Sequence, residues 1–555
     1  QVSRPVFIAS ATVIFTFVAF AVLFTPAAER LFAALQGWIS SVFGWFYVLS
    51  ATAFLAFVIY LAFSRYGLVR LGDPFEQPRF GLGGWFAMLF SAGMGIGLVF
   101  WSVAEPMLHF LRPPFGAPGD VTLAMRSTFF HWGLHAWGVY CVVGLAIGYF
   151  AYRQKLPITI RSALYPLLGE RIYGPIGHAV DTFAIFGTMF GVATSLGLGV
   201  LQINSGLDFL LGVGESAWLQ VAIIAVVTLM ATGSVVLGLS RGIQRLSQIN
   251  IVLSVALLVF VLLTGPTLFL LRFLVEGVGD YLQHLPSLSL WNDAVAQSGW
   301  QDAWTIFYWG WWISWAPFVG LFIARVSRGR TVREFVAGAL LAPTLAGFVW
   351  LTVMGGTGLQ QHMTGIVDLG AAVEANVATP LFIMLDQLPW TALTATIATI
   401  LVVTYFVTSS DSGSLVIDML AAGGHTDPPK VQRVFWAVTE GVVAGVLLVL
   451  GGLTALQTAS IAAGLPFAVI MWLMCFALLK ALKDEPVTPD PGEREPEAPP
   501  STMGDLEHVE PDDVEPAEEP ASAGDDDASR AEDPHGAAGD DQAKKSPASK
   551  PPKDA

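Results

Sequence analysis

The chain has 555 residues, of which 54% are hydrophobic and only 13% are charged, and its mean hydropathy is +0.62. This composition excludes a soluble globular domain and indicates a polytopic membrane protein. The net charge of −15 does not describe the apolar part, because 22 of the 43 acidic residues lie in residues 484–555. We expect this segment, rich in Pro, Ala and acidic residues, to be a disordered cytoplasmic tail, with a regulatory role as the alternative.

Twelve apolar segments are long enough to cross a hydrocarbon layer of about 30 Å. They lie at residues 6–25, 42–63, 83–105, 129–152, 178–205, 217–239, 248–271, 304–324, 335–356, 391–422, 432–452 and 456–480. We therefore expect an all-α membrane protein with twelve transmembrane helices. The first segment lacks a small-residue cleavage site and is followed by another apolar segment, which favours a retained helix over a signal peptide.

Lysine and arginine gather in alternate loops between these segments. The loops that would face outward hold only Arg30, Arg112, Arg126 and Arg272. Because basic residues concentrate on the cytoplasmic side of a membrane, this alternation predicts a multi-pass protein of the plasma membrane with both termini in the cytoplasm.

The third apolar segment contains alternating glycines at Gly93, Gly95 and Gly97. Each glycine weakens a helix by about 1 kcal/mol relative to alanine, so the backbone is expected to open here. In a membrane such a break is tolerated where it lines a cavity or binds an ion, and Ser91 and the carbonyl of Met94 could hold a cation. Close helix packing through small residues is the alternative.

The fourth segment reads HWGLHAWGVYCVVG from residue 131. On a helix, its aromatic side chains form an arc at about 0°, 80° and 140°, in the order Trp132, Tyr140 and Trp137. His131 and His135 have the i, i+4 spacing of zinc ligands, but they face away from this arc, and no nearby acidic residue supplies a general base or third ligand. We expect these histidines to serve helix packing.

The eighth segment contains the aromatic run WTIFYWGWWISWAPF at residues 304–318. One narrow stripe of this helix contains Trp304, Tyr308, Trp311 and Trp315, with Trp312 at its edge. Aromatic faces attract a quaternary ammonium group by roughly 2 kcal/mol or more when the contact is desolvated. The run alone is equally compatible with anchoring at the lipid interface.

The tenth segment holds a polar cluster within an apolar helix, at Thr408, Ser409, Ser410, Asp411 and Ser412. Hydroxyl and carbonyl oxygens suit a small monovalent cation, so we interpret the cluster as an ion site. Hydrogen bonds from the hydroxyls to carbonyls of the same helix are the alternative. We favour a structural role for Asp411 over proton transfer, and expect Glu105, next to Pro106, to be a helix-terminus residue, with a gating ion pair to an arginine as the alternative.

Six strings together resemble the betaine/choline/carnitine transporter family over roughly residues 5–482. They are WTxFYWxWWxSWxPF, the glycine stretch before WSVAEP, HWGLHxWxxY, FGTMFGVATSLGLGVLQINSGL, SRGIQRLSQINI and FVTSSDSGS. The resemblance implies a leucine-transporter-type fold with two extra N-terminal helices and two inverted five-helix repeats, helices 3–7 and 8–12. The expected parts are the N-terminal helices at 1–82, the first repeat at 83–275, an amphipathic periplasmic connector at 276–303, the second repeat at 304–483 and the tail at 484–555.

The resemblance also implies site residues. The box around a trimethylammonium group would consist of Trp132, Trp137, Tyr140 and Trp312, and the substrate path would include Trp311 and Trp315. A substrate carboxylate would meet backbone amides at Gly93, Gly95 and Gly97. Sodium would be held by Ser91, Met94, Tyr405, Thr408 and Ser409. A second sodium ion would involve Thr188 or Thr194 with Phe318.

The function implied is sodium-coupled uptake of a compatible solute, with glycine betaine the first choice. Proton-coupled choline transporters of the family tend to carry an acidic residue where this chain has Gly97, which favours a zwitterionic substrate. A sodium-independent exchanger or a proton-coupled carrier for carnitine, choline or ectoine is the alternative. The resemblance further implies a homotrimer, no enzymatic activity, no nucleic-acid partner and no cofactor besides the coupling sodium ion.

Overall fold

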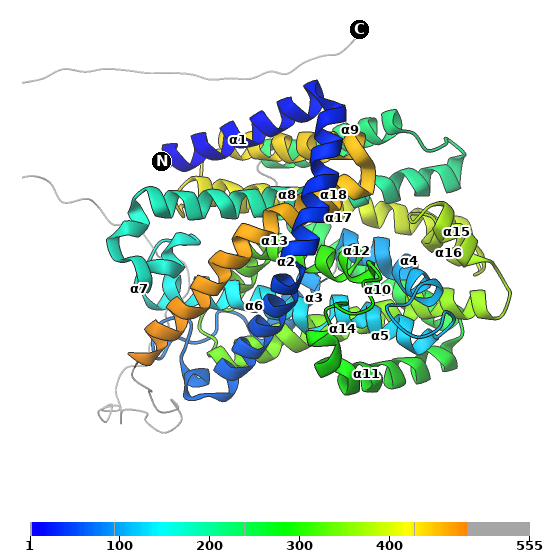
Figure 1. Ribbon diagram of the computed structural model, residues 1–555, viewed down its shortest axis with the longest axis horizontal. Coiled ribbons are helices and arrows are strands. Elements are labelled where there is room, and N and C mark those ends of the chain that lie inside the picture. The colour runs from blue at the N-terminus through cyan, green and yellow to red at the C-terminus, as the bar shows by residue number, and fades with distance from the viewer. Residues whose placement is uncertain (1–2, 94, 238–239, 427, 486–555) are drawn as a thin grey trace, which may run out of the picture. The chain divides into compact units, whose positions relative to one another are not determined.

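The computed structural model describes residues 3–93, 95–237, 240–426 and 428–485 (Figure 1). They belong to one compact unit, Gln1–Arg494. Met94 and nearly all of the predicted acidic tail lie outside the described residues.

The described residues are almost entirely helical, and their only β-contact is the isolated bridge between Arg70 and Thr331. Shorter helical turns occupy Arg65–Leu68, Tyr149–Arg153, Arg161–Leu164 and Gly169–Tyr173. The α-helices are α1 (Arg4–Leu23), α2 (Thr25–Phe63), α3 (Leu82–Gly93), α4 (Ile96–Leu111), α5 (Val121–Trp132), α6 (Leu134–Gly148), α7 (Tyr165–Leu168), α8 (Pro175–Leu211), α9 (Ala217–Leu237), α10 (Ser240–Thr264), α11 (Thr267–Leu290), α12 (Trp300–Ala303), α13 (Thr305–Val326), α14 (Val332–Met363), α15 (Leu369–Ala375), α16 (Pro380–Asp386), α17 (Thr391–Ala421) and α18 (Lys430–Lys483).

Ten spans in the described part of the chain are long and apolar enough to cross a membrane, and all twelve predicted segments fall in helical regions. The third predicted segment is divided between α3 and α4. The last two lie within α18, where Gly451 and Gly452 have non-helical dihedral angles and bend the helix. The chain is thus a multi-pass, all-helical membrane protein, while the exact number of crossings remains a prediction.

The predicted seventh segment, residues 248–271, is wrong at its C-terminal end. Helix α10 ends at Thr264, and a new helix, α11, begins at Thr267. Pro266 lies between them and cannot continue a helix, because it has no backbone N–H. The predicted connector at 276–303 thus begins within α11.

The predicted fourth helix is interrupted at Gly133, which separates α5 from α6. A Cβ atom at this position would lie 2.6 Å from the carbonyl oxygen of Phe129 and 2.8 Å from the hydroxyl of Tyr281, so only glycine fits. The Tyr281 hydroxyl accepts a hydrogen bond from the backbone N–H of Leu134 at 3.1 Å. The break is stable in the membrane because α11 satisfies a backbone group that the interruption leaves free.

Helix α13 lies at the centre of the packing that forms the site. It contacts α6, α8 and α18, while α8, α17 and α18 also contact one another (Figure 1). Nearly every side chain of α13 is buried, including Tyr308, Trp309, Trp311 and Trp312. The aromatic run is therefore an internal element rather than an interfacial belt.

Candidate functional site

Four aromatic rings from three helices surround a small cavity. Its volume is about 30 Å³, and its lining includes Trp132 of α5, Trp137 and Tyr140 of α6, and Trp312 of α13. The ring centroids of Trp132 and Trp312 are 5.0 Å apart, those of Trp137 and Tyr140 are 5.3 Å apart, and those of Tyr140 and Trp312 are 6.2 Å apart. All four rings of the predicted box thus line one space, although α5 and α6 are not one continuous helix.

Two polar groups of this cavity have no hydrogen-bond partner among the described residues. They are the hydroxyl of Tyr140 and the indole N–H of Trp315. Buried polar groups are nearly always paired, so free donors in an otherwise apolar lining point to a ligand that supplies the acceptor. The cavity has room for about two water molecules, which means that the rings must separate to admit an organic solute.

A second cavity adjoins the first at the break between α3 and α4. It has a volume of about 20 Å³ and shares Leu98, Trp132, Trp312 and Trp315 with the ring cavity. Its remaining lining is Gly95, Ile96, Gly97, Ser195, Trp311 and Ser409. Because α4 begins at Ile96, its partly positive N-terminus borders this space, as a site for a substrate carboxylate requires.

The three glycines of the break have different surroundings. Gly93 ends α3, and Gly95 is the extended residue before α4. A Cβ atom at Gly97 would lie 2.4 Å from the Trp311 ring and 3.2 Å from the Trp132 ring, whereas one at Gly95 would have open space around it. The predicted interruption is confirmed, and Gly97 is the glycine whose small size lets the aromatic rings approach the helix.

The other rings of the aromatic run form a ladder along α13. Trp311 stacks on Trp312 with 4.6 Å between ring centroids, and its indole N–H donates to the carbonyl of Gly191 in α8 at 3.3 Å. Trp315 lies 6.5 Å from Trp312 and lines both cavities. Trp309 instead stacks on His135, 5.5 Å away, and so belongs to the packing.

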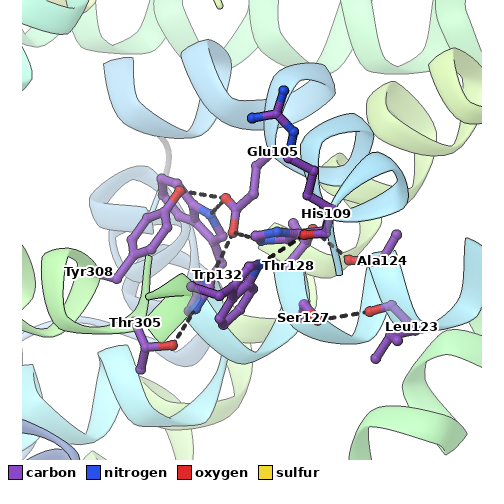
Figure 2. Close-up of polar contacts among 12 residues, drawn as sticks. Glu105, His109, Leu123, Ala124, Ser127, Thr128, Trp132, Thr305 and Tyr308 are labelled. Atoms are coloured by element: carbon purple, nitrogen blue, oxygen red, sulfur yellow. Dashed lines mark hydrogen bonds and ion pairs between the residues drawn. The ribbon is translucent and has the colours of Figure 1, made fainter. Parts of the chain in front are cut away.

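Glu105 is fully buried, and Figure 2 shows it among Trp132, Tyr308 and His109. Its Oε2 accepts hydrogen bonds from the Trp132 indole at 2.7 Å and the Tyr308 hydroxyl at 2.5 Å. Its Oε1 lies 2.7 Å from Nδ1 of His131 and 3.2 Å from Nε2 of His109. The carboxylate therefore fixes the orientation of Trp132, and with it one wall of the cavity.

Two predictions about this region are wrong. Glu105 is not a helix-terminus residue but lies inside α4, and no arginine pairs with it among the described residues. His131 does have an acidic neighbour, which sequence proximity could not reveal because Glu105 lies 26 residues upstream. Glu105, His109 and His131 are of metal-ligating types and lie within 4.8 Å of one another, but hydrogen bonds within the cluster use their facing atoms. An ionisable residue inside an apolar segment was the signal that could have identified Glu105.

The predicted sodium ligands lie at three places. Ser409 borders the helix break in the second cavity, and Ser91 is half-buried in α3. The hydroxyl of Thr408 donates to the carbonyls of Thr404 and Tyr405, at 3.0 and 3.2 Å. The Tyr405 hydroxyl pairs with Ser254 of α10 at 2.8 Å, and Met94 lies outside the described residues.

The two threonines considered for a second sodium ion have different hydrogen-bond partners. Thr188 donates to the carbonyl of Ala184 in its own helix. Thr194 lies 2.8 Å from the Ser460 hydroxyl and donates to the carbonyl of Leu456 at 2.9 Å, so it faces α18.

Asp411 accepts a hydrogen bond from Arg433 at 2.9 Å and forms a structural ion pair between α17 and α18.

Comparison with known proteins places the chain in a family. The sequence matches the betaine/carnitine/choline family of transporters over residues 5–487. A glycine betaine transporter of Acinetobacter baylyi is 49% identical, over 87% of this chain and 74% of the relative. A glycine betaine transporter of Bacillus subtilis is 42% identical over 84% of this chain and 91% of the relative, and an osmo-dependent choline transporter of Acinetobacter baylyi is 45% identical over 87% and 72%.

The match covers every helix that contributes to the two cavities. Members of this family are transporters and not enzymes. Together with the all-helical multi-pass fold, these similarities show that the chain belongs to the betaine/carnitine/choline transporter family.

Proposed function

We propose that the protein is a sodium-coupled symporter for a quaternary-ammonium compatible solute, with glycine betaine as its main substrate. The observation that carries this proposal is the aromatic ring cavity adjoining a helix break. Four aromatic faces suit a trimethylammonium group. The relatives include transporters named for glycine betaine and for choline, which share that group.

In this proposal the ammonium group lies between Trp132, Trp137, Tyr140 and Trp312. The carboxylate of the solute lies at the N-terminus of α4, where backbone amides of the break face the second cavity. Sodium binds beside it at Ser409 and Thr408 of α17, and Ser91, Met94 and the backbone carbonyl of Tyr405 complete the site; this carbonyl lies 3.2 Å from the Thr408 hydroxyl. Two neighbouring cavities therefore serve the two ends of one zwitterion.

Transport follows alternating access. Sodium draws α17 toward the break, the solute completes the closure of the rings, and the bundle of α3/α4, α5/α6, α13 and α14 tilts against the other helices to release inward. Each sodium ion supplies about 2.3 kcal/mol per 100 mV of membrane potential and about 1.4 kcal/mol per tenfold gradient. With cytoplasmic termini and a trimeric assembly, the protein would accumulate a neutral osmolyte against a steep gradient.

Uptake into proteoliposomes tests this proposal. Labelled glycine betaine should enter only with an inward sodium gradient, and unlabelled choline, carnitine, ectoine and proline should compete less well than glycine betaine. Uptake that is unchanged after sodium is replaced by potassium would contradict sodium coupling. Preferential competition by choline would instead support the proton-coupled choline carrier, and counterflow without any ion gradient would support the exchanger.

A further inference from the structure

The carboxylate of Glu105 presents a full negative charge to the back of the ring cavity. Its two oxygens face four possible donors, from Trp132, Tyr308, His109 and His131. An ionised carboxylate offers about four acceptor positions, and an indole N–H can only donate. The four donors match the ionised form, whereas a protonated carboxyl would place a further hydrogen among them.

The contacts of the two imidazoles fit neutral rings. Nδ1 of His131 lies 2.7 Å from Oε1 of Glu105, and its Nε2 lies 3.1 Å from the hydroxyl of Thr305, which can donate to it (Figure 2 shows Thr305 and Glu105). Nδ1 of His109 has no partner among the described residues, which suits an unprotonated nitrogen. Neutral rings satisfy each of these contacts, and with both rings neutral the cluster keeps the negative charge of Glu105.

Nearby arginines are committed to other partners. Arg112, at the end of α4, pairs with Glu374, and Arg126 in α5 pairs with Asp280. Among the described residues, the ion-pair contacts of Glu105 are with the two imidazoles alone. A buried charge without a cation is strongly unfavourable, so the structure leaves a place for a positive charge next to the ring cavity.

We propose that Glu105 is the counter-charge of the bound quaternary ammonium group and sets the preference of the site between cationic and zwitterionic solutes. This inference rests on the proposed function, because it requires the ammonium group to occupy the ring cavity. Trp132 connects the two places: its N–H donates to Glu105 and its ring lines the cavity. An ammonium group on that ring lies roughly 7 Å from the carboxylate, where the attraction is on the order of a tenfold gain in affinity.

Helix α4 gives the site an electrostatic direction. Its partly positive N-terminus at Ile96 borders the second cavity, and Glu105 follows nine residues later, about 14 Å along the axis. A zwitterion therefore binds with its carboxylate at Ile96 and its ammonium group on the side of Glu105. Choline carries only the positive charge and gains the whole attraction, whereas the carboxylate of glycine betaine is repelled by Glu105 and cancels part of it.

The substitution Glu105→Gln removes the charge without leaving unpaired groups. The amide oxygen can accept from Trp132 and Tyr308, and the amide NH₂ can donate to His109 and His131 once each neutral imidazole moves its proton to the other nitrogen. Glu105→Asp keeps the charge but shortens the side chain. Tyr308→Phe removes one donor and keeps the charge. Glu276→Gln, at an exposed position of α11, is the matched control for losing a carboxylate.

The experiment measures dissociation constants of choline and glycine betaine for the purified full-length protein and each variant, by isothermal titration calorimetry at constant sodium. Glu105→Gln should weaken choline on the order of tenfold and glycine betaine only about threefold, because the zwitterion loses a smaller net attraction. Glu105→Asp and Tyr308→Phe should weaken both solutes by similar factors and keep their ratio. Glu276→Gln should change neither constant.

Equal weakening of both solutes by Glu105→Gln would overturn the inference, because a purely structural role alters both alike. A change in their ratio in Glu105→Asp, which retains the charge, would also overturn it. If the wild-type protein binds neither solute, the proposed function itself fails. If the wild type binds both and only the ratio test fails, the aromatic site stands and the counter-charge does not.

Discussion

The ring cavity and the hydroxyl cluster of α17 differ in how far they are already assembled. In the ring cavity, the indoles of Trp132 and Trp312 are fixed by hydrogen bonds to Glu105 and to the carbonyl of His131, both within 2.8 Å. On α17, Thr408 is bonded to carbonyls of its own helix, and Tyr405 is bonded to α10.

This difference indicates whether the organic solute or the sodium ion orders the site when it binds. In the proposed function, the organic cation binds between rings that must separate to admit it, but the indoles of Trp132 and Trp312 are already oriented by hydrogen bonds, so little conformational freedom is lost there on binding. A sodium ion would replace the carbonyl partners of Thr408 and draw the other proposed ligands toward Ser409, which already borders the helix break. We therefore expect the rings to determine substrate affinity and sodium to shift the population of the closed state.

The largest expected effect is that of Trp312→Leu. Losing one desolvated ring removes about 2 kcal/mol of attraction for the ammonium group, so the dissociation constant for glycine betaine should rise about 30-fold in a calorimetric titration. Trp309→Leu is the control, because Trp309 packs on His135 and should lower the melting temperature while changing affinity less than threefold. Unchanged betaine affinity in Trp312→Leu would remove this ring from the site.

The double substitution Thr408→Ala and Ser409→Ala should come next. The loss of two oxygen ligands should raise the sodium concentration for half-maximal uptake about tenfold. Each hydrogen bond or ligand to a charge contributes roughly 1.5–3 kcal/mol, and other oxygens replace part of what the two alanines remove. Thr404→Ala is the control: its hydroxyl is likewise bonded to carbonyls of α17, but it lies outside the proposed set of ligands, so this concentration should stay unchanged. The same sodium dependence in both variants would show that the ion binds elsewhere.

A pair of glycine substitutions tests the lining of the second cavity. Gly97→Ala should weaken glycine betaine about fivefold, because the added Cβ collides with the Trp311 ring, and such overpacking costs about 1–3 kcal/mol. Gly95→Ala should be nearly neutral, since its φ of −162° suits any residue and its Cβ would meet no neighbour. Binding titrations in which Gly95→Ala is the more damaging change would contradict the assigned roles.

The smallest effect is expected for Tyr405→Phe. It removes the hydroxyl that pairs with Ser254, and the loss of one buried hydrogen bond costs about 1 kcal/mol of stability. Sodium-dependent uptake should change less than threefold, because the hydroxyl faces α10 and not the break. A tenfold loss of sodium affinity would show instead that this hydroxyl reaches the ion during transport.

The features that could be predicted from the sequence are those that depend on residues close together in the chain. The alternating glycines predicted the interruption before Ile96, and the spacing of the aromatic run predicted the ladder on α13. Both depend on the helical period and on glycine propensity, which are properties of neighbouring residues.

Contacts between distant segments could not be predicted in this way. The break at Gly133 depends on Tyr281, which is far along the chain and supplies the acceptor for Leu134. The cluster around Glu105 combines residues of α4, α5 and α13, so no single segment contains its pattern. For the same reason, the partners of Thr408 and Tyr405 became visible only in the structure.

A structure of the protein in lipid nanodiscs, with saturating glycine betaine and sodium, tests the central claim most directly. The account predicts density for the trimethylammonium group within about 6 Å of the ring centroids of Trp132, Trp137, Tyr140 and Trp312, with the carboxylate toward Ile96. Density for the solute outside the ring cavity, or with its carboxylate on the side of Glu105, would contradict it.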